Sequence, residues 1–324
     1  MKTDRIFIVI IVAALLAVSF GAGWQMVNIF KEEQPKKVSV IVNNSSLGRW
    51  NGFNEGLRQG ASDRGIRLNI VSTGEFTSMN SEKDVIEKEI SNGADALIIQ
   101  IFSSYNQSEY LEKLSEGIPL VLVENDSDPE DVFASVTPDN KMIGQELAGL
   151  VKDALKGKSC KRIGILAGNQ EQLAMFQRLA GLRKGLEGSD IDIAWQISGY
   201  TDAHLDILIK NNQSGSYADA IVSLGDGETE KAIDYYAAHS EMQENVIFGV
   251  GNSEKAAYYL DKGLIADLLV IDDYNMGYSC IKAVSEQIDN SFTAEKHKAV
   301  GYHVMDSRNM YDMDNQLLLF PKEK

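Results

Sequence analysis

Cysteine is scarce in this sequence, which excludes several classes of protein. Among the 324 residues only Cys160 and Cys280 occur. Two cysteines so far apart provide neither a disulfide framework nor the paired ligands of a zinc site. We expect both to be small buried residues, Cys160 at the entrance of a strand and Cys280 within a helix. The first 37 residues contain no cysteine, so a lipid anchor attached there through a cysteine is excluded.

Basic residues are in the minority as well. Lysine and arginine total 31 against 47 aspartates and glutamates, which gives a formal net charge of -16. Binding to nucleic-acid phosphates usually requires a basic stripe, so nucleic acid is not an expected partner. The chain is still 44% hydrophobic, enough for two cores of ordinary size.

Catalytic signatures are also missing. The sequence has no Gly-x-Ser-x-Gly elbow, no Walker loop and no His-Glu-x-x-His helix, and its four histidines are scattered. Gly-Asp-Gly at 225–227 lacks the following glycine and lysine that would hold a phosphate. We therefore expect no enzyme, no catalytic residue, no cofactor and no metal site.

One apolar run, residues 6–24, carries no charge and follows Lys2 and Arg5. At 1.5 Å per residue it is roughly 28 Å long, about the thickness of a membrane's hydrocarbon core. The basic residues before it predict a cytoplasmic N-terminus and a body on the extracytoplasmic face of a bacterial membrane, held by one N-terminal transmembrane helix. A cleaved signal peptide, with small residues near position 17, is the alternative and would give a secreted protein.

Beyond residue 37, short β-branched runs alternate with amphipathic stretches at the spacing of βα units. The first series has strands at 38–42, 68–71, 96–101 and 119–123, with a helix that stops at Gly65 and another that ends at Gly93. Strands without polar alternation fit a sheet covered on both faces. This half of the pattern predicts a doubly wound α/β lobe with a parallel sheet.

A second series follows Thr-Pro-Asp-Asn at 137–140 and predicts a second lobe of the same class. A helix is expected at 141–155 and another at 274–287. The expected strands lie at 162–167, 191–197, 220–224, 246–250, 265–270 and 299–304.

Ligands of open parallel sheets bind beyond the carboxyl ends of the strands. Polar and aromatic residues at those positions are the candidate ligand-binding residues, since aromatic rings cover the C–H face of a small ring compound and carboxylates or amides take its hydroxyls. Capping or turn chemistry is the alternative role for Asp126, Asp226 and Asn252. The candidates are Asn44, Arg49, Trp50, Phe102, Glu124 and Asp126 from the first lobe, and Phe176, Arg178, Tyr200, Asp226, Asn252 and Asp272 from the second.

Several segments resemble the type I periplasmic sugar-binding proteins, the ribose- and galactose-binding group. They are Asn-Gly-Phe-Asn-Glu-Gly-Leu at 51–57, Asn-Gly-Ala-Asp-Ala-Leu-Ile-Ile at 92–99, Gly-Ile-Pro-Leu-Val at 117–121, Thr-Pro-Asp-Asn at 137–140, Gly-Leu-Arg-Lys-Gly-Leu at 181–186 and Tyr-Asn-Met-Gly-Tyr at 274–278. The resemblance implies lobe 1 at 37–137 with 273–301, lobe 2 at 138–272 with 302–324, three crossings that form a hinge, and 1–36 as anchor or signal and linker.

The resemblance also assigns roles within the candidate set. Trp50 matches an aromatic residue that stacks on the sugar, Glu124 an acidic residue that binds hydroxyls, and Tyr200 an aromatic residue on the opposite wall. Asn44 and Arg178 match more loosely. Phe176 stands where an arginine is usual, and Gly225, Gly251 and Ile271 replace Asn, Asp and Gln, so the neighbouring Asp226, Asn252 and Asp272 are expected to substitute for them.

The resemblance implies an extracytoplasmic solute-binding protein whose lobes close by a hinge on a small polar ligand, a sugar, and deliver it to an ABC transporter permease. A membrane-anchored sensor that presents the closed state to a histidine kinase is the alternative. An intracellular transcription regulator is disfavoured because residues 1–30 replace the helix-turn-helix it would need. For Trp50 two environments stay open, a ligand platform in the cleft or a core position shared with Phe53.

Overall fold

The computed structural model describes residues 34–46, 48–105, 107–125, 133–158, 161–199, 202–239, 246–289 and 297–320, together with residue 19. All the elements below belong to one compact unit, Lys36–Lys324. Among the described residues no helix is long and apolar enough to cross a membrane. The predicted span at 6–24 lies outside the described residues except for Ser19.

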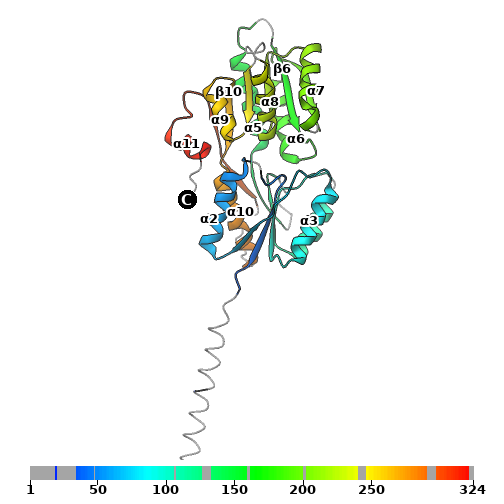
Figure 1. Ribbon diagram of the computed structural model, residues 1–324, viewed down its shortest axis with the longest axis vertical. Helices are drawn as coiled ribbons and strands as arrows, with labels where there is room; N and C mark the ends of the chain where they lie inside the picture. The colour runs from blue at the N-terminus through cyan, green and yellow to red at the C-terminus, as the bar shows by residue number, and fades with distance from the viewer. Residues whose placement is uncertain are drawn as a thin grey trace, which may run out of the picture. The chain divides into compact units, whose positions relative to one another are not determined.

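The first of two six-stranded sheets is entirely parallel, with strand order β11-β5-β4-β3-β1-β2. Figure 1 shows α2 and α10 together beside this sheet and α3 on its other side. Its strands are β1 (Lys37–Ile41), β2 (Arg67–Ile70), β3 (Ala96–Ile99), β4 (Leu120–Val123), β5 (Ala134–Pro138) and β11 (His297–Val300), and its helices are α2 (Trp50–Arg64), α3 (Met79–Ser91), α4 (Ser108–Gly117) and α10 (Asp273–Ile288).

The second sheet has the order β12-β10-β9-β8-β6-β7, and only the β10–β12 pair is antiparallel. Its strands are β6 (Arg162–Gly168), β7 (Asp192–Ser198), β8 (Ala220–Ser223), β9 (Val246–Val250), β10 (Ile265–Ile271) and β12 (Tyr302–Met305), and the helices of this half are α5 (Asn140–Ala154), α6 (Leu173–Leu186), α7 (Asp202–Gly215), α8 (Asp226–Ala238), α9 (Glu254–Asp261) and α11 (Met313–Leu319). The predicted α/β class with two doubly wound lobes is therefore confirmed.

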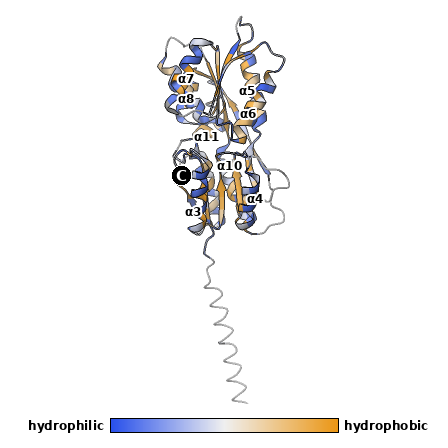
Figure 2. Cartoon of the chain, turned by 90° about the vertical axis from the view of Figure 1, so that its right-hand side faces the viewer, coloured by the Kyte–Doolittle hydropathy of each residue, from blue (hydrophilic) through white to orange (hydrophobic). Residues whose placement is uncertain are grey.

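Side-chain alternation explains why each sheet is covered on both faces. In β1, Val40 packs in the same cluster as the α2 residue Leu57, whereas its neighbour Ile41 packs with Ile86 of α3. Both faces of these strands are apolar, as the unbroken hydrophobic runs predicted. In Figure 2 the orange of hydrophobic residues is concentrated in the strands of both halves.

Glycines allow two helix pairs to approach closely. A Cβ on Gly56 in α2 would lie 2.0 Å from the carbonyl oxygen of Tyr274 in α10, and one on Gly181 in α6 would lie 2.1 Å from that of Lys141 in α5. Both glycines open a similar segment, Gly-Leu-Arg-Gln-Gly at 56–60 and Gly-Leu-Arg-Lys-Gly at 181–185. The same local sequence thus creates the same helix crossing in each half.

Most predicted elements have the observed type, and one strand assignment is wrong. The expected strand at 299–304 is two strands: β11 pairs with β5 in the first sheet, and β12 pairs with β10 in the second. Strand periodicity cannot reveal which partner a segment will find, so the change of sheet at Gly301 was missed. Strand β5 was not assigned either, although the first sheet was expected to have room for another unit.

Two further predictions are confirmed. Helix α2 ends at Arg64, and Gly65 adopts the left-handed conformation with φ 61°, which glycine accepts without steric cost. Cys280 lies buried within α10 as a free thiol, and burial raises its pKa. Cys160 lies outside the described residues.

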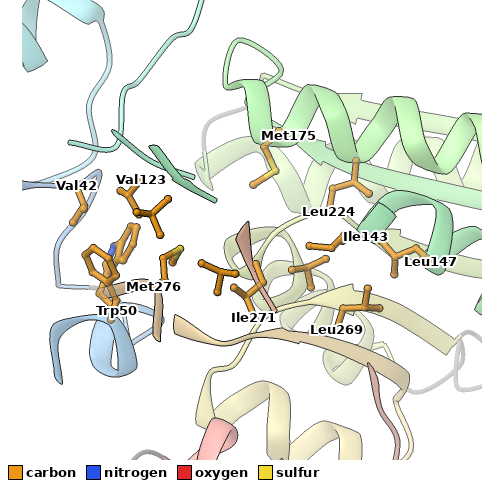
Figure 3. Close-up of a cluster of buried hydrophobic side chains, with 14 of the residues drawn as sticks. Val42, Trp50, Val123, Ile143, Leu147, Met175, Leu224, Leu269, Ile271 and Met276 are labelled. Carbon is orange, nitrogen blue, oxygen red and sulfur yellow. The ribbon is translucent and has the colours of Figure 1, made fainter. Parts of the chain in front are cut away.

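The chain passes between the two sheets three times, from β5 to β6, from β10 to β11 and from β11 to β12. A continuous hydrophobic cluster also runs through both halves. Figure 3 shows Trp50 and Met276 of the first half on one side of this cluster and Leu147 of the second half on the other.

Candidate functional site

A cavity lies at the carboxyl ends of the strands, between the two halves. The empty space at this site is about 260 Å³, a volume that includes the part open to solvent. Its lining comes from the last residues of strands, from the loops after them and from helices of both halves, as expected for open parallel sheets. The lining residues are Arg49, Glu124, Arg178, Asp226, Val250, Gly251, Asn252, Ile271 and Asp273.

Glu124 forms the centre of the charged lining. It follows β4 directly and adopts φ 54°, a left-handed conformation that is unusual for a residue with a side chain. Its Oε2 atom accepts hydrogen bonds from Arg49 Nη2 and from Gln100 Nε2, both at 2.6 Å. Backbone strain of this kind persists where surrounding contacts fix the residue, often at functional sites.

Arg178 reaches the same carboxylate from the other half of the molecule. Its Nε donates to Asn140 Oδ1 and its Nη1 to the carbonyl of Leu224, both at 2.8 Å. Its Nη2 lies 3.6 Å from Glu124 Oε1 but has no hydrogen-bond partner among the described residues. The side chain is only 1% exposed, so this donor faces the cavity rather than bulk solvent.

The opposite wall is acidic and comes from three elements. Asp226 opens α8, Asn252 follows β9 and Asp273 opens α10. The backbone N–H of Asn252 donates to Asp226 Oδ1 at 3.0 Å, and its Nδ2 donates to Asp273 Oδ2. These bonds tie two helix starts together through one asparagine.

Burial shifts the pKa of each carboxyl group in this cluster. Desolvation raises the pKa of Asp226 to about 6 and that of Asp273 to about 8, although the charge of Arg49 opposes both shifts. Burial also acts to raise the pKa of Glu124, but the positive charges of Arg49 and Arg178 outweigh it and lower that pKa. Glu124 is therefore the ionised partner of the two arginines.

Direct hydrogen bonds also join the two halves. The Nδ2 atom of Asn169 donates to the carbonyl of Phe102 at 3.0 Å. The N–H of Ser104 donates to the carbonyl of Glu171 at 2.8 Å, and its Oγ accepts from the N–H of Leu173 at 3.0 Å. The segment after β3 is thus hydrogen-bonded to the segment before α6.

Comparison with protein families identifies the chain. The sequence model of the periplasmic binding protein domain matches residues 38–291. The chain belongs to this family. Its members are binding proteins, so the predictions of a periplasmic binding-protein family and of a protein without enzymatic activity are confirmed. No curated protein matches the sequence.

Solved structures share the fold of this periplasmic binding protein. A carbohydrate transporter solute-binding protein from Agrobacterium radiobacter, in complex with D-arabinose, superposes with a TM-score of 0.81 at 18% identity over 89% of this chain and 100% of that one. GanP, a glucose-galactose binding protein from Geobacillus stearothermophilus, gives 0.76 at 16% identity over 86% and 100%. The XylFII-LytSN complex gives 0.72 at 16% identity over 85% and 98%.

The cavity brings together five of the twelve residues predicted to bind ligand. They come from both halves, which the order of elements along the chain anticipated. Asp126 and Tyr200 lie outside the described residues. The five that line the cavity are Arg49, Glu124, Arg178, Asp226 and Asn252.

Trp50 lies in the core and is 1% exposed. Its indole N–H donates to the carbonyl of Asn43 at 3.2 Å, and its ring centroid lies 5.3 Å from that of Phe53. The guanidinium of Arg49 lies over the ring, 4.0 Å from its centroid. The Trp50 ring therefore packs against Arg49, which lines the cavity, and does not line the cavity itself.

Four further candidates are absent from the cavity lining. Phe176 is 56% exposed on α6, and Phe102 contributes its carbonyl to the contact with Asn169. Asn44 has φ 46° and accepts a hydrogen bond from Ser46. Asp272 caps α10 by accepting from the N–H of Asn275. Cap and turn roles thus explain the positions of Asn44 and Asp272.

Sequence reasoning missed Asp273. The pair Asp272-Asp273 offers two carboxylates, and only one can be the helix cap. Because Asp272 bends back to its own helix, the first helical residue, Asp273, carries the carboxylate that lines the cavity. Asp226 also opens a helix, α8, and was predicted as a binding residue. The same position at the start of a helix could have indicated Asp273.

Among the described residues no group of three or more histidine, cysteine, aspartate or glutamate side chains has the arrangement of a metal site. Arg49 and Arg178 line this cavity together with its carboxylates, and both lie within 4.0 Å of Glu124. The lining is suited to binding a polar organic molecule by hydrogen bonds and charge.

Proposed function

We propose that this periplasmic binding protein closes on a small polar ligand, a sugar, outside the cytoplasm and delivers it to an ABC transporter permease. The observation that carries the proposal is a cavity whose hydrogen-bonding lining comes from both halves of the molecule, with Glu124 on one side and Arg178 on the other. A ligand that contacts both halves binds the closed state best and shifts the population toward it.

We propose lobe 1 as 37–137 with 273–301 and lobe 2 as 138–272 with 302–324, and the three passages between the sheets as the hinge. The membership of β5, β11 and β12 in the two sheets supports these boundaries. The names of similar structures, a carbohydrate transporter solute-binding protein and a glucose-galactose binding protein, support a sugar as the ligand class.

To test the proposed function, the purified full-length protein is denatured and the released small molecules are identified by mass spectrometry. We expect a sugar, and adding it back should reduce the radius of gyration measured by small-angle scattering. Saturated binding with an unchanged radius would contradict closure, and binding of no sugar from a broad panel would contradict the ligand class.

A sensor role is the second candidate function. The similarity to the XylFII-LytSN complex supports it, because one neighbour of this fold was solved bound to another protein. In that case the closed state is presented to a histidine kinase instead of a permease. Co-purification from the native membrane with and without ligand distinguishes the two partners.

We also propose that residues 1–36 keep the protein on the extracytoplasmic face of the membrane. The uncharged run at 6–24 behind Lys2 and Arg5 supports an uncleaved anchor. N-terminal sequencing of the exported protein should find Met1 in the membrane fraction. A soluble chain that begins near Phe20 would instead indicate a cleaved signal peptide.

A further inference from the structure

The acidic wall of the cavity offers more acceptors than donors. Asn252 donates its backbone N–H to Asp226 and one of its two Nδ2 hydrogens to Asp273. Its remaining polar atom, Oδ1, is buried without a hydrogen-bond partner among the described residues. Asp226 and Asp273 are carboxylates, which only accept when ionised. When both carboxyls are ionised, a ligand group that supplies hydrogens therefore satisfies this wall best.

The charges of the cavity are not balanced within the protein. Glu124 pairs with both arginines, at 2.6 Å from Arg49 and 3.6 Å from Arg178. Asp226 and Asp273 have no basic group within 4.0 Å among the described residues, so three carboxylates face two guanidiniums. Asp226 and Asp273 each lie in the first turn of a helix, where the helix dipole favours the ionised carboxylate. When all three carboxyls are ionised, one negative charge is left without a counterion. Burial raises the pKa of Asp273 to about 8, so in the empty cavity at neutral pH this carboxyl is largely protonated.

Arg178, in contrast, provides the cavity with a hydrogen-bond donor that lacks an acceptor. Arg178 Nη2 is a donor without a hydrogen-bond partner, on a side chain that is 1% exposed. A buried donor without a partner destabilises the empty cavity, so a ligand oxygen that accepts a hydrogen bond from it gains affinity.

The geometry points to a ligand that carries a primary ammonium group on a polyhydroxylated body, an amino sugar being the simplest example. Its ammonium lies against Asp226, Asn252 Oδ1 and Asp273, and one of its oxygens accepts from Arg178 Nη2. Three N–H groups match three acceptors, and the positive charge favours ionisation of Asp273 and balances the charge that results. A neutral hydroxyl supplies one hydrogen and leaves its lone pairs facing acceptors. This inference rests on the proposed function and names its ligand class.

The pH dependence follows from the groups that face the two aspartates. Arg49, Arg178, Glu124, Asp226 and Asp272 act on Asp273. Arg49, Glu228 and Glu230 act on Asp226. Burial raises the pKa of Asp226 to about 6, so part of this carboxyl is protonated in mild acid. Burial raises the pKa of Asp273 to about 8, so this carboxyl is largely protonated at neutral pH. Binding an ammonium favours the ionised carboxylates, so affinity should increase from about pH 5 to about pH 8, over the range in which the amine of the ligand stays protonated.

Calorimetry on the full-length protein tests the inference with matched compounds. D-Glucosamine, D-galactosamine and D-mannosamine are each compared with the parent hexose and with the N-acetyl derivative. We expect at least one amine to bind about ten-fold or more tightly than both of its neutral relatives. Equal or tighter binding of the neutral hexose overturns the ammonium inference and leaves the proposed function standing. Failure of all three amines to bind also overturns it, whether or not a neutral sugar binds.

Isosteric variants locate the effect. Asp273→Asn and Asp226→Asn should each weaken binding of the amine about ten-fold or more while changing binding of its parent hexose much less. Asp272→Asn is the matched control, because it removes a neighbouring charge, keeps a side chain that caps helices well and lies outside the cavity lining. Equal losses for amine and hexose in the two cavity variants would contradict a charge-specific contact.

Discussion

Replacing Glu124 with glutamine is expected to lower the free energy of unfolding of the ligand-free protein by roughly 3 to 5 kcal/mol, the usual cost of removing one partner from a buried ion pair. The change keeps the shape of the side chain and the left-handed backbone at this position, so it isolates the charge. The guanidiniums of Arg49 and Arg178 would then face each other without the carboxylate that separates them.

Urea unfolding at neutral pH measures this effect. Glu187→Gln is the control, since Glu187 also pairs with a basic residue, Lys184, but is 64% exposed, and its midpoint should stay close to that of the wild type. A Glu124→Gln midpoint that is equally unchanged would contradict the role of this carboxylate at the centre of the cavity.

The same variant has a defined pH dependence. The pKa of Glu124 is lowered in the folded state, so its contribution is complete above the ordinary carboxyl pKa of about 4.3 and is lost as the pH falls through the lowered value. The stability difference between wild type and Glu124→Gln should therefore shrink in acid. Because Glu124 also contacts Arg178 of the other half, the ligand-free variant should show a larger radius of gyration in small-angle scattering.

Trp50→Ala is expected to destabilise the ligand-free protein by roughly 3 to 5 kcal/mol, because the indole is 1% exposed and packs with Phe53 in the core. Affinity should fall less than stability, through the loss of the ring beneath Arg49. Thermal unfolding and ligand titration of the same preparation provide both values. The reverse result, an unchanged melting temperature with a large loss of affinity, would make Trp50 a ligand platform.

Two further variants separate the contributions at this position. Trp50→Phe keeps an aromatic ring but loses the N–H that donates to Asn43, so it should cost only about 1 kcal/mol beyond the change in packing. Phe176→Ala removes an aromatic side chain that is 56% exposed and should leave the melting temperature close to that of the wild type.

The fold could be predicted from the sequence because its signal is local and repeated. Apolar runs at the spacing of βα units indicated buried parallel strands, and Gly65 marked the end of α2 through a conformation that only glycine adopts easily. The position of the cavity followed from the same pattern, since the carboxyl ends of parallel strands meet at one edge. Five predicted residues do lie together there.

Only the tertiary structure decided which side chain at each strand end faces the cavity. Asp272 and Asp273 are adjacent and chemically identical, and the cap of α10 uses the first and leaves the second to the cavity. Trp50 could have faced cleft or core, and the packing of α2 against the sheet placed it in the core together with Phe53. These positions depend on contacts between residues far apart in the chain. The local sequence therefore indicated which residues could line the cavity, and long-range packing determined which of them do.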